Sequence, residues 1–138
     1  SRGHADGGQA DVGQAGDGGP ATHDGFDEAA AAEWCARRHS DGGVSGRTNK
    51  PPDSCYAFWV GAALRLLGAA DRAAPPTRFV ASCEKLDTGG FAKFPERCPP
   101  DILHTFYSLA ALSWTEPGLS DIDPALGICA KRVRRHFS

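Results

Sequence analysis

The feature that most constrains this fold is an internal repeat in the second half of the chain. The pair Pro52-Asp53 recurs as Pro100-Asp101, 48 positions later, and Phe58, Trp59 and Leu64 match Phe106, Tyr107 and Leu112 at the same offset. A Gly-Gly pair precedes each copy, at 42–43 and 89–90. Each unit is therefore predicted to consist of a helix, a Gly-Gly pair that ends it, a loop, and a Pro-Pro-Asp segment that begins the next helix. Such a hairpin cannot bury its own apolar face, so the units should stack side by side into a solenoid or a closed α-α toroid.

Apolar residues spaced three and four apart predict four helices and an all-α fold. The first helix covers 28–38, and Asp41-Gly42-Gly43 ends it. The second begins at an Asp53 N-cap, carries apolar residues at 55, 58, 59, 62, 63, 66 and 67, and stops at Gly68. The third follows Pro75-Pro76, buries Phe79, Val80, Cys83 and Leu86, and stops at Gly89-Gly90. The fourth follows Asp101, with the apolar face Leu103, Phe106, Tyr107, Ala110, Ala111 and Trp114.

Length and composition allow one domain at most in these 138 residues. Residues 1–25 are rich in Gly and lack a hydrophobic period, so we expect a flexible segment there and a packed domain over 26–138. Two repeats are too few for a stable stack, and Met is absent, including at position 1. Both facts indicate a fragment or a processed chain.

The net charge of −2 creates no overall positive electrostatic field that would attract nucleic acid or an anionic membrane. No apolar run approaches the ~20 residues that span a bilayer, and the first residues lack a secretory signal. We therefore expect no stable membrane insertion. The basic run 131–136 is interpreted as a solvated helix end.

Five cysteines without a CxxC pair indicate a reducing compartment, and we expect a cytoplasmic protein. Cys35 and Cys83 fall on apolar helix faces and are expected in the core. An alternative, a secreted disulfide-bonded helical domain, is disfavoured by the odd number of cysteines.

Asp53, Cys55 and His104 form a candidate metal site. The repeat offset places His104 one residue past the equivalent of Cys55, so parallel units would bring the first turns of both helices together. One carboxylate, one thiol and one imidazole leave a fourth position open, as in catalytic zinc sites. Taken singly, each residue is better explained as a helix cap or a core side chain, and only the combination favours a site.

Arg47, Lys50 and Lys93 stand in the loops before the same two helices, together with Tyr56. Loop cations often serve only solubility. Cations and a phenol around helix starts also suit a diphosphate, which needs several charge-assisted donors. The aromatic residues Phe58, Trp59, Phe106 and Tyr107 are expected in the core, or on the wall of an apolar cavity at the centre of a toroid.

The segments 46–62, 89–93 and 101–104 closely resemble protein prenyltransferase β subunits, most of all those of geranylgeranyltransferase type I. The likeness covers roughly 26–137, the C-terminal portion of such a subunit. It implies an α-α barrel and a zinc ion bound by Asp53, Cys55 and His104.

The resemblance also implies roles for the other candidates. Arg47, Lys50 and Tyr56 would hold the diphosphate of geranylgeranyl diphosphate, and Trp59 would line the isoprenoid cavity. Leu103 would lie where the family contacts the CaaX box at the C-terminus of the protein substrate. Lys93 stands where farnesyltransferase and the Rab-specific enzyme place a magnesium-binding Asp, so no magnesium requirement is expected.

The family works as a heterodimer with an α subunit that supplies a further catalytic lysine. Its earlier barrel helices, with a diphosphate-binding histidine and most of the peptide pocket, have no counterpart in residues 1–25. We therefore expect this chain alone to be inactive. Two alternatives stay open: the β subunit of farnesyltransferase or of the Rab enzyme, and a non-catalytic toroid that only binds a partner or a lipid.

Overall fold

The computed structural model describes residues 25–96 and 98–137, and the expected flexible segment lies almost wholly outside them. The chain forms the helices α1 (Glu28–Ala36), α2 (Tyr56–Leu66), α3 (Thr77–Ser82), α4 (Ile102–Leu112) and α5 (Ala130–Phe137), with a 3₁₀ turn at Ala70–Arg72. A two-residue hairpin, β1 (His39–Ser40) and β2 (Gly43–Val44), follows α1. The expected all-α class is confirmed, with this small sheet as an addition.

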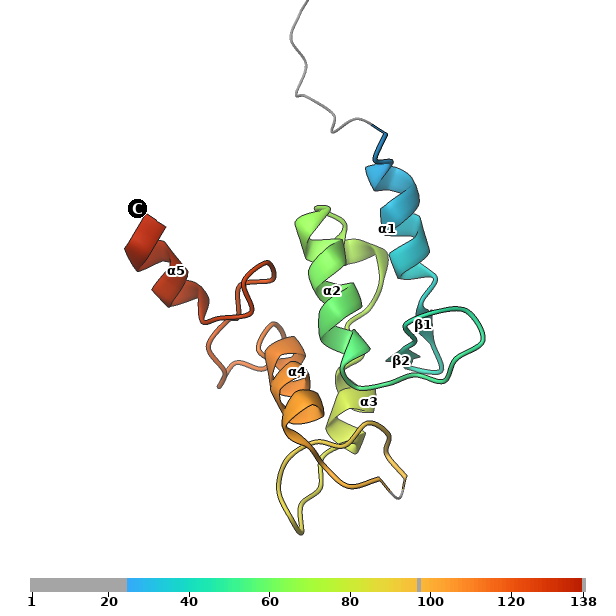
Figure 1. Ribbon diagram of the computed structural model, residues 1–138, viewed down its shortest axis with the longest axis vertical. Helices are drawn as coiled ribbons and strands as arrows, with labels where there is room; N and C mark the ends of the chain where they lie inside the picture. The colour runs from blue at the N-terminus through green and yellow to red at the C-terminus, as the bar shows by residue number, and fades with distance from the viewer. Residues whose placement is uncertain (1–24, 97, 138) are drawn as a thin grey trace, which may run out of the picture.

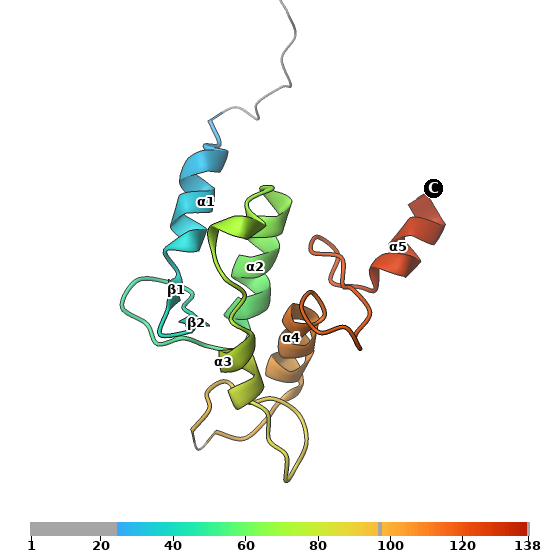
Figure 2. The ribbon, with the colours of Figure 1, turned by 180° about the vertical axis from the view of Figure 1, so that it is seen from behind.

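The two repeats lie side by side, with α2 packed along α4 (Figure 1). Both helices run in the same direction, because Asp53 faces His104 near their starts and the Arg65 guanidinium lies over the Trp114 ring near their ends. α1 lies on the other side of α2, and α3 packs against α4. Seen from behind, α5 lies to the side of α4, away from α1 and α3 (Figure 2). The parallel arrangement is the one that the repeat predicts.

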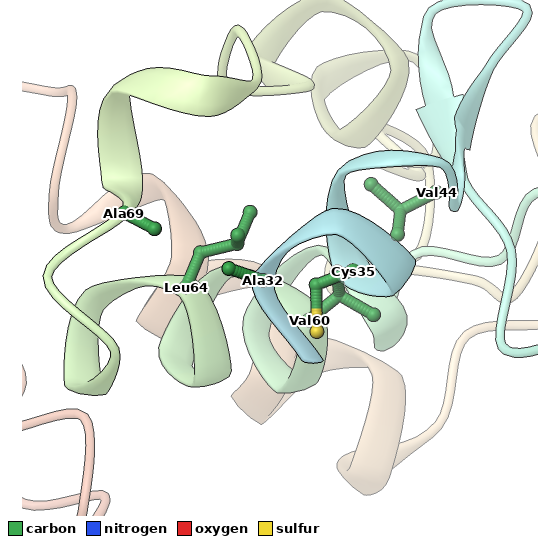
Figure 3. Close-up of a cluster of buried hydrophobic side chains, with 6 residues drawn as sticks. All are labelled: Ala32, Cys35, Val44, Val60, Leu64 and Ala69. Carbon is green, nitrogen blue, oxygen red and sulfur yellow. The ribbon is translucent and has the colours of Figure 1, made fainter. Parts of the chain in front are cut away.

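Helix α2 is buried on two faces. Toward α1 it presents Val60 and Leu64, which join a buried cluster with Ala32, Cys35, Val44 and Ala69 (Figure 3). Toward α4 it presents Phe58 and Ala62, which pack on Ala110. The single apolar stripe expected for α2 was therefore wrong in part: Val60 and Leu64 are core, whereas Trp59 and Leu66 are 38% and 60% exposed.

A third cluster joins α2 through Ala57 to Val80, Cys83, Phe91 and Leu112. Cys83 is fully buried, and burial raises the pKa of its thiol to about 11, as for an inert core residue. The expected burial of Cys35 and Cys83 is confirmed, and all five cysteines are free.

Three expected helix boundaries were wrong. α2 begins at Tyr56, because the Asp53 side chain accepts from the Cys55 amide and caps no helical turn. α1 ends at Ala36, and Asp41 and Gly42 instead form the positive-φ turn of the hairpin. α3 ends at Ser82, since Gly89 and Gly90 turn the chain so that Lys85 pairs with Gly90.

Three side chains that were expected on buried faces are also partly or largely exposed. Leu86 follows the end of α3 and is 88% exposed. On α4, Leu103 and Phe106 are each nearly half exposed, whereas Ala110 is buried as expected. Part of the α4 face therefore has no cover among the described residues.

Close packing at Gly43 gives a stability test. A Cβ added there would lie 2.8 Å from Cγ of Phe79 and closer still to Pro52. We expect Gly43→Ala to lower the free energy of unfolding by about 1–3 kcal/mol through overpacking. Gly118→Ala is the control, because nothing lies within 4 Å of its added Cβ. Denaturant unfolding of both variants checks this, and equal stabilities would contradict it.

Candidate metal centre and anion pocket

The carboxylate of Asp53 is held just before α2. The Asp53 amide donates to the carbonyl of Val44 at 3.0 Å, and Oδ1 accepts from the Cys55 amide at 3.1 Å. The residue is only 6% exposed. A buried carboxylate needs partners to offset its desolvation, and its further neighbours are His104 and Lys93.

His104 lies in the first turn of α4, where Asp101 orients it. Asp101 is the N-cap: Oδ1 accepts from the His104 amide at 2.9 Å, and Oδ2 lies 2.6 Å from Nδ1 of the imidazole. These hydrogen bonds from His104 lower the pKa of the Asp101 carboxyl. The arrangement leaves Nε2 of His104 facing Oδ1 of Asp53 at 3.3 Å.

The donor atoms of Asp53, Cys55 and His104 all lie within 4.8 Å of one another. Some point is therefore no more than about 2.8 Å from all three, against zinc bonds of about 2.0–2.3 Å. A small contraction would give each donor bonding distance. The sulfur, nitrogen and oxygen set suits a divalent transition metal with one coordination position left open.

The Cys55 thiol is a weaker acid than an ordinary cysteine. Burial raises its pKa strongly, and the hydrogen bond and negative charge of Asp53 raise it further. A metal ion must therefore displace a proton to gain the thiolate ligand, and its affinity falls as the pH falls.

Next to the donors is a cavity of about 370 Å³ that contains the expected cations. Its lining is Gly46, Arg47, Lys50, Pro51, Asp53, Tyr56, Lys93 and Phe94. Nζ of Lys93 lies 3.6 Å from Oδ2 of Asp53. Asp53 thus belongs to both the metal centre and this anion pocket, and all three loop cations and Tyr56 are brought together.

The loop that carries Arg47 and Lys50 is held in shape by a hydrogen bond, a left-handed turn and a close ring contact. Nη1 of the buried Arg38 donates to Thr48 Oγ1 at 2.9 Å. Asn49 adopts a left-handed φ of 61°, which turns the chain toward Lys50. Gly46 lies against the Tyr56 ring, and a side chain there would overlap it.

An aromatic row leads away from the anion pocket. The ring of Tyr56 meets Trp59 edge-on at 5.0 Å, Trp59 meets Tyr107 at 4.9 Å, and Tyr107 meets Phe106 at 5.1 Å. Trp59, Phe106 and the neighbouring Leu103 are each 38–46% exposed. The row forms an open apolar surface that starts at the cationic pocket.

Sequence reasoning missed three residues of this site. Asp101 was expected only to start a helix, although its spacing of three from His104 is a usable signal for an oriented imidazole. Gly46 and Arg38 shape the cation loop through contacts that no local pattern indicates.

Comparisons with known proteins bear on the family to which this chain belongs. Residues 12–128 match the prenyltransferase alpha-alpha toroid domain family. The chain is 45% identical over 108 residues to the geranylgeranyl transferase type-1 subunit beta of Arabidopsis thaliana, covering 75% of this chain and 28% of that protein. For the Dictyostelium discoideum type-1 subunit beta, the identity is 39% over 107 residues, covering 75% and 30%.

Among solved structures, Candida albicans protein geranylgeranyltransferase-I complexed with GGPP aligns with a TM-score of 0.68 and 25% identity, covering 75% of this chain and 35% of that one. A type-2 subunit beta from Saccharomyces cerevisiae is 36% identical over 81 residues, covering 57% and 25%. This chain thus spans less than a third of its curated relatives' length. The family expected from the sequence is confirmed: the chain belongs to the prenyltransferase alpha-alpha toroid family, with type-1 beta subunits among its relatives.

Proposed function

We propose that this chain is the C-terminal part of the β subunit of a protein geranylgeranyltransferase type I. The reaction would transfer geranylgeranyl from its diphosphate to the cysteine of a C-terminal CaaX box. One observation carries the proposal: a three-donor metal centre shares Asp53 with a pocket lined by three cations. A thiol and an allylic diphosphate are the two reactants that such a pair of sites would hold side by side.

The metal proposed at Asp53, Cys55 and His104 is zinc. When bound, it would hold the substrate cysteine as a thiolate at its open position. The chain's own part is to fix the donors. Asp53 is held by the Cys55 amide, and the His104 ring is held by Asp101.

Arg47, Lys50, Lys93 and Tyr56 are proposed to bind the diphosphate. As the bond to C1 of the isoprenoid breaks, negative charge grows on the leaving oxygens, and donors already in place stabilise it. The Tyr56 hydroxyl donates without adding charge. These groups therefore stabilise the departing diphosphate. The new thioether bond would form between C1 of the isoprenoid and the sulfur of the substrate cysteine, beside the proposed metal donors.

The aromatic row is proposed to hold the isoprenoid chain. Tyr56 lines the anion pocket and contacts Trp59, so a diphosphate bound there would have its hydrocarbon beside the exposed indole. Leu103, next to His104 and nearly half exposed, is proposed to contact the aliphatic residues of the CaaX box.

Lys93 favours type I over the related enzymes. Its ammonium lies in the pocket where a magnesium ion would otherwise supply positive charge. Type-2 and farnesyltransferase subunits are also among the relatives, at 36% and 31% identity, against 45% for the Arabidopsis type-1 subunit. We therefore propose that the enzyme works without magnesium.

The proposed partners are an α subunit, geranylgeranyl diphosphate and CaaX-protein C-termini, and the proposed location is the cytoplasm. Among the described residues, none of the helices has the length and apolarity needed to cross a membrane.

Removing a metal donor tests the metal centre. In the full-length subunit paired with its α subunit, we expect Cys55→Ala and His104→Ala to lose bound zinc and to reduce alkylation at least 100-fold. Affinity for geranylgeranyl diphosphate should change less than threefold, since the anion pocket keeps its cations. Cys35→Ala removes a buried thiol of α1 and is the control. Zinc retained at full stoichiometry in both donor variants would refute the site.

Asp101 offers a test of imidazole orientation. Asn is also a good N-cap, so Asp101→Asn should keep α4 folded while removing the charge beside Nδ1 of His104. We expect zinc affinity, measured by competition with a chelator, to fall about 10-fold. Asp27→Asn is the matched control, because Asp27 caps α1 through the same kind of bond to Ala30. An equal loss in both variants would mean that capping alone matters.

Lys93→Asp tests the subtype. The new carboxylate would stand beside Asp53 in the diphosphate pocket, where two acids repel the anion unless a cation lies between them. We expect turnover of the paired enzyme to fall at least 10-fold without magnesium and to recover with millimolar magnesium. Lys131→Asp makes the same charge change on exposed α5 and should leave turnover independent of magnesium. If turnover by the Lys93→Asp variant did not depend on magnesium, the assignment to type I would lose its main support.

A further inference from the structure

Ser54 stands between the metal donors Asp53 and Cys55, yet its side chain points to the other repeat. The residue is fully buried. Its hydroxyl donates to the carbonyl of Ala92 at 2.8 Å, and its amide donates to the carbonyl of Lys93 at 3.1 Å. Both bonds join positions 38 and 39 apart in sequence, and they are made by a single residue.

These two bonds fix the backbone immediately around Lys93. Ala92 is also fully buried, and its amide donates to the carbonyl of Cys83. The Lys93 side chain is 46% exposed. The Lys93 ammonium lies 3.6 Å from Asp53 and 5.2 Å from the centroid of the Phe94 ring, and it can keep these contacts only while the Lys93 backbone stays in place.

We propose that Ser54 is a positioning residue that sets the Lys93 ammonium in the anion pocket relative to the metal donors. The inference rests on the proposed function, since it assigns Ser54 a part in binding the diphosphate through Lys93. The hydroxyl is what matters. Alanine at this position would leave the Ala92 carbonyl buried without this donor, and the Lys93 segment would shift to regain one.

The first experiment measures binding of inorganic pyrophosphate and of geranylgeranyl diphosphate to the paired enzyme, by calorimetry. Ser54→Ala should weaken both about 10-fold and leave zinc stoichiometry unchanged. Ser108→Ala is the matched control, because Ser108 is equally buried and its hydroxyl has no hydrogen-bond partner within residues 25–96 and 98–137. That variant should bind both ligands within twofold of the wild type. Wild-type affinity in Ser54→Ala would overturn the inference.

A double-mutant cycle separates positioning from general loss of structure. If Ser54 acts through Lys93, adding Ser54→Ala to Lys93→Ala should weaken pyrophosphate binding by less than twofold. A full additional 10-fold loss would show that the hydroxyl acts by another route, and would also overturn the inference.

Amide hydrogen exchange distinguishes this failure from failure of the proposed function. If the wild-type enzyme binds no pyrophosphate, the proposed function is refuted. Amide exchange then tests by itself whether Ser54 anchors the Lys93 segment. We expect Ser54→Ala to speed exchange at the amides of residues 54 and 92 at least 10-fold, with no change in Ser108→Ala. Unchanged exchange rates at both amides would show that Ser54 does not anchor the Lys93 segment.

Discussion

The parallel packing of α2 on α4 is the constraint on which the rest of the structure depends. Its register is set by ring contacts between the helices, with Phe58 and Trp59 of α2 packed on Tyr107 of α4. Stacking of Phe58 on Trp114, at 5.1 Å between ring centroids, sets it further along. A slip of one residue would turn each side chain of α4 by about 100° around the helix axis. The imidazole of His104 would then face away from Asp53, and no metal centre could form.

The sequence was sufficient to predict this register, because the repeat offset equates the starts of the two helices. It was not sufficient for the boundaries. Periodicity continued the third helix to Leu86, whereas the positive φ of Gly89 and Gly90 folds the chain back earlier and leaves Leu86 in solvent. Asp53 was expected both to cap α2 and to lie near His104 at the candidate metal site. The carboxylate does not cap the helix, but it does face His104 at 3.3 Å. Its contact with Lys93 at 3.6 Å joins positions 40 apart, and neither local periodicity nor the repeat indicated it.

Asp53 joins the two halves of the candidate site through charge. A buried carboxylate is costly unless it is paired, and here it faces an ammonium at 3.6 Å and an imidazole at 3.3 Å. Burial raises the pKa of the Cys55 thiol, and the hydrogen bond and charge of Asp53 raise it further. A cation at the donors would offset the Asp53 charge and leave the Lys93 charge freer to attract an anion. We expect this coupling to be small, because Arg47, Lys50 and Lys93 line the pocket whether or not a metal is bound.

The repeat also explains which apolar surface is left open. Phe58 and Phe106 occupy equivalent positions, yet Phe58 is 6% exposed and Phe106 is 45% exposed. Two rings, those of Tyr107 and Trp114, pack on Phe58. Among the described residues, Phe106 has the ring of Tyr107 on its own helix and Gly127 nearby, which cover it less. Ile102 and Leu109 on α4 are open as well, at 89% and 42%. In a stack of hairpins each unit buries the face of its neighbour, so this edge of α4 is the face on which a further unit of a toroid would pack.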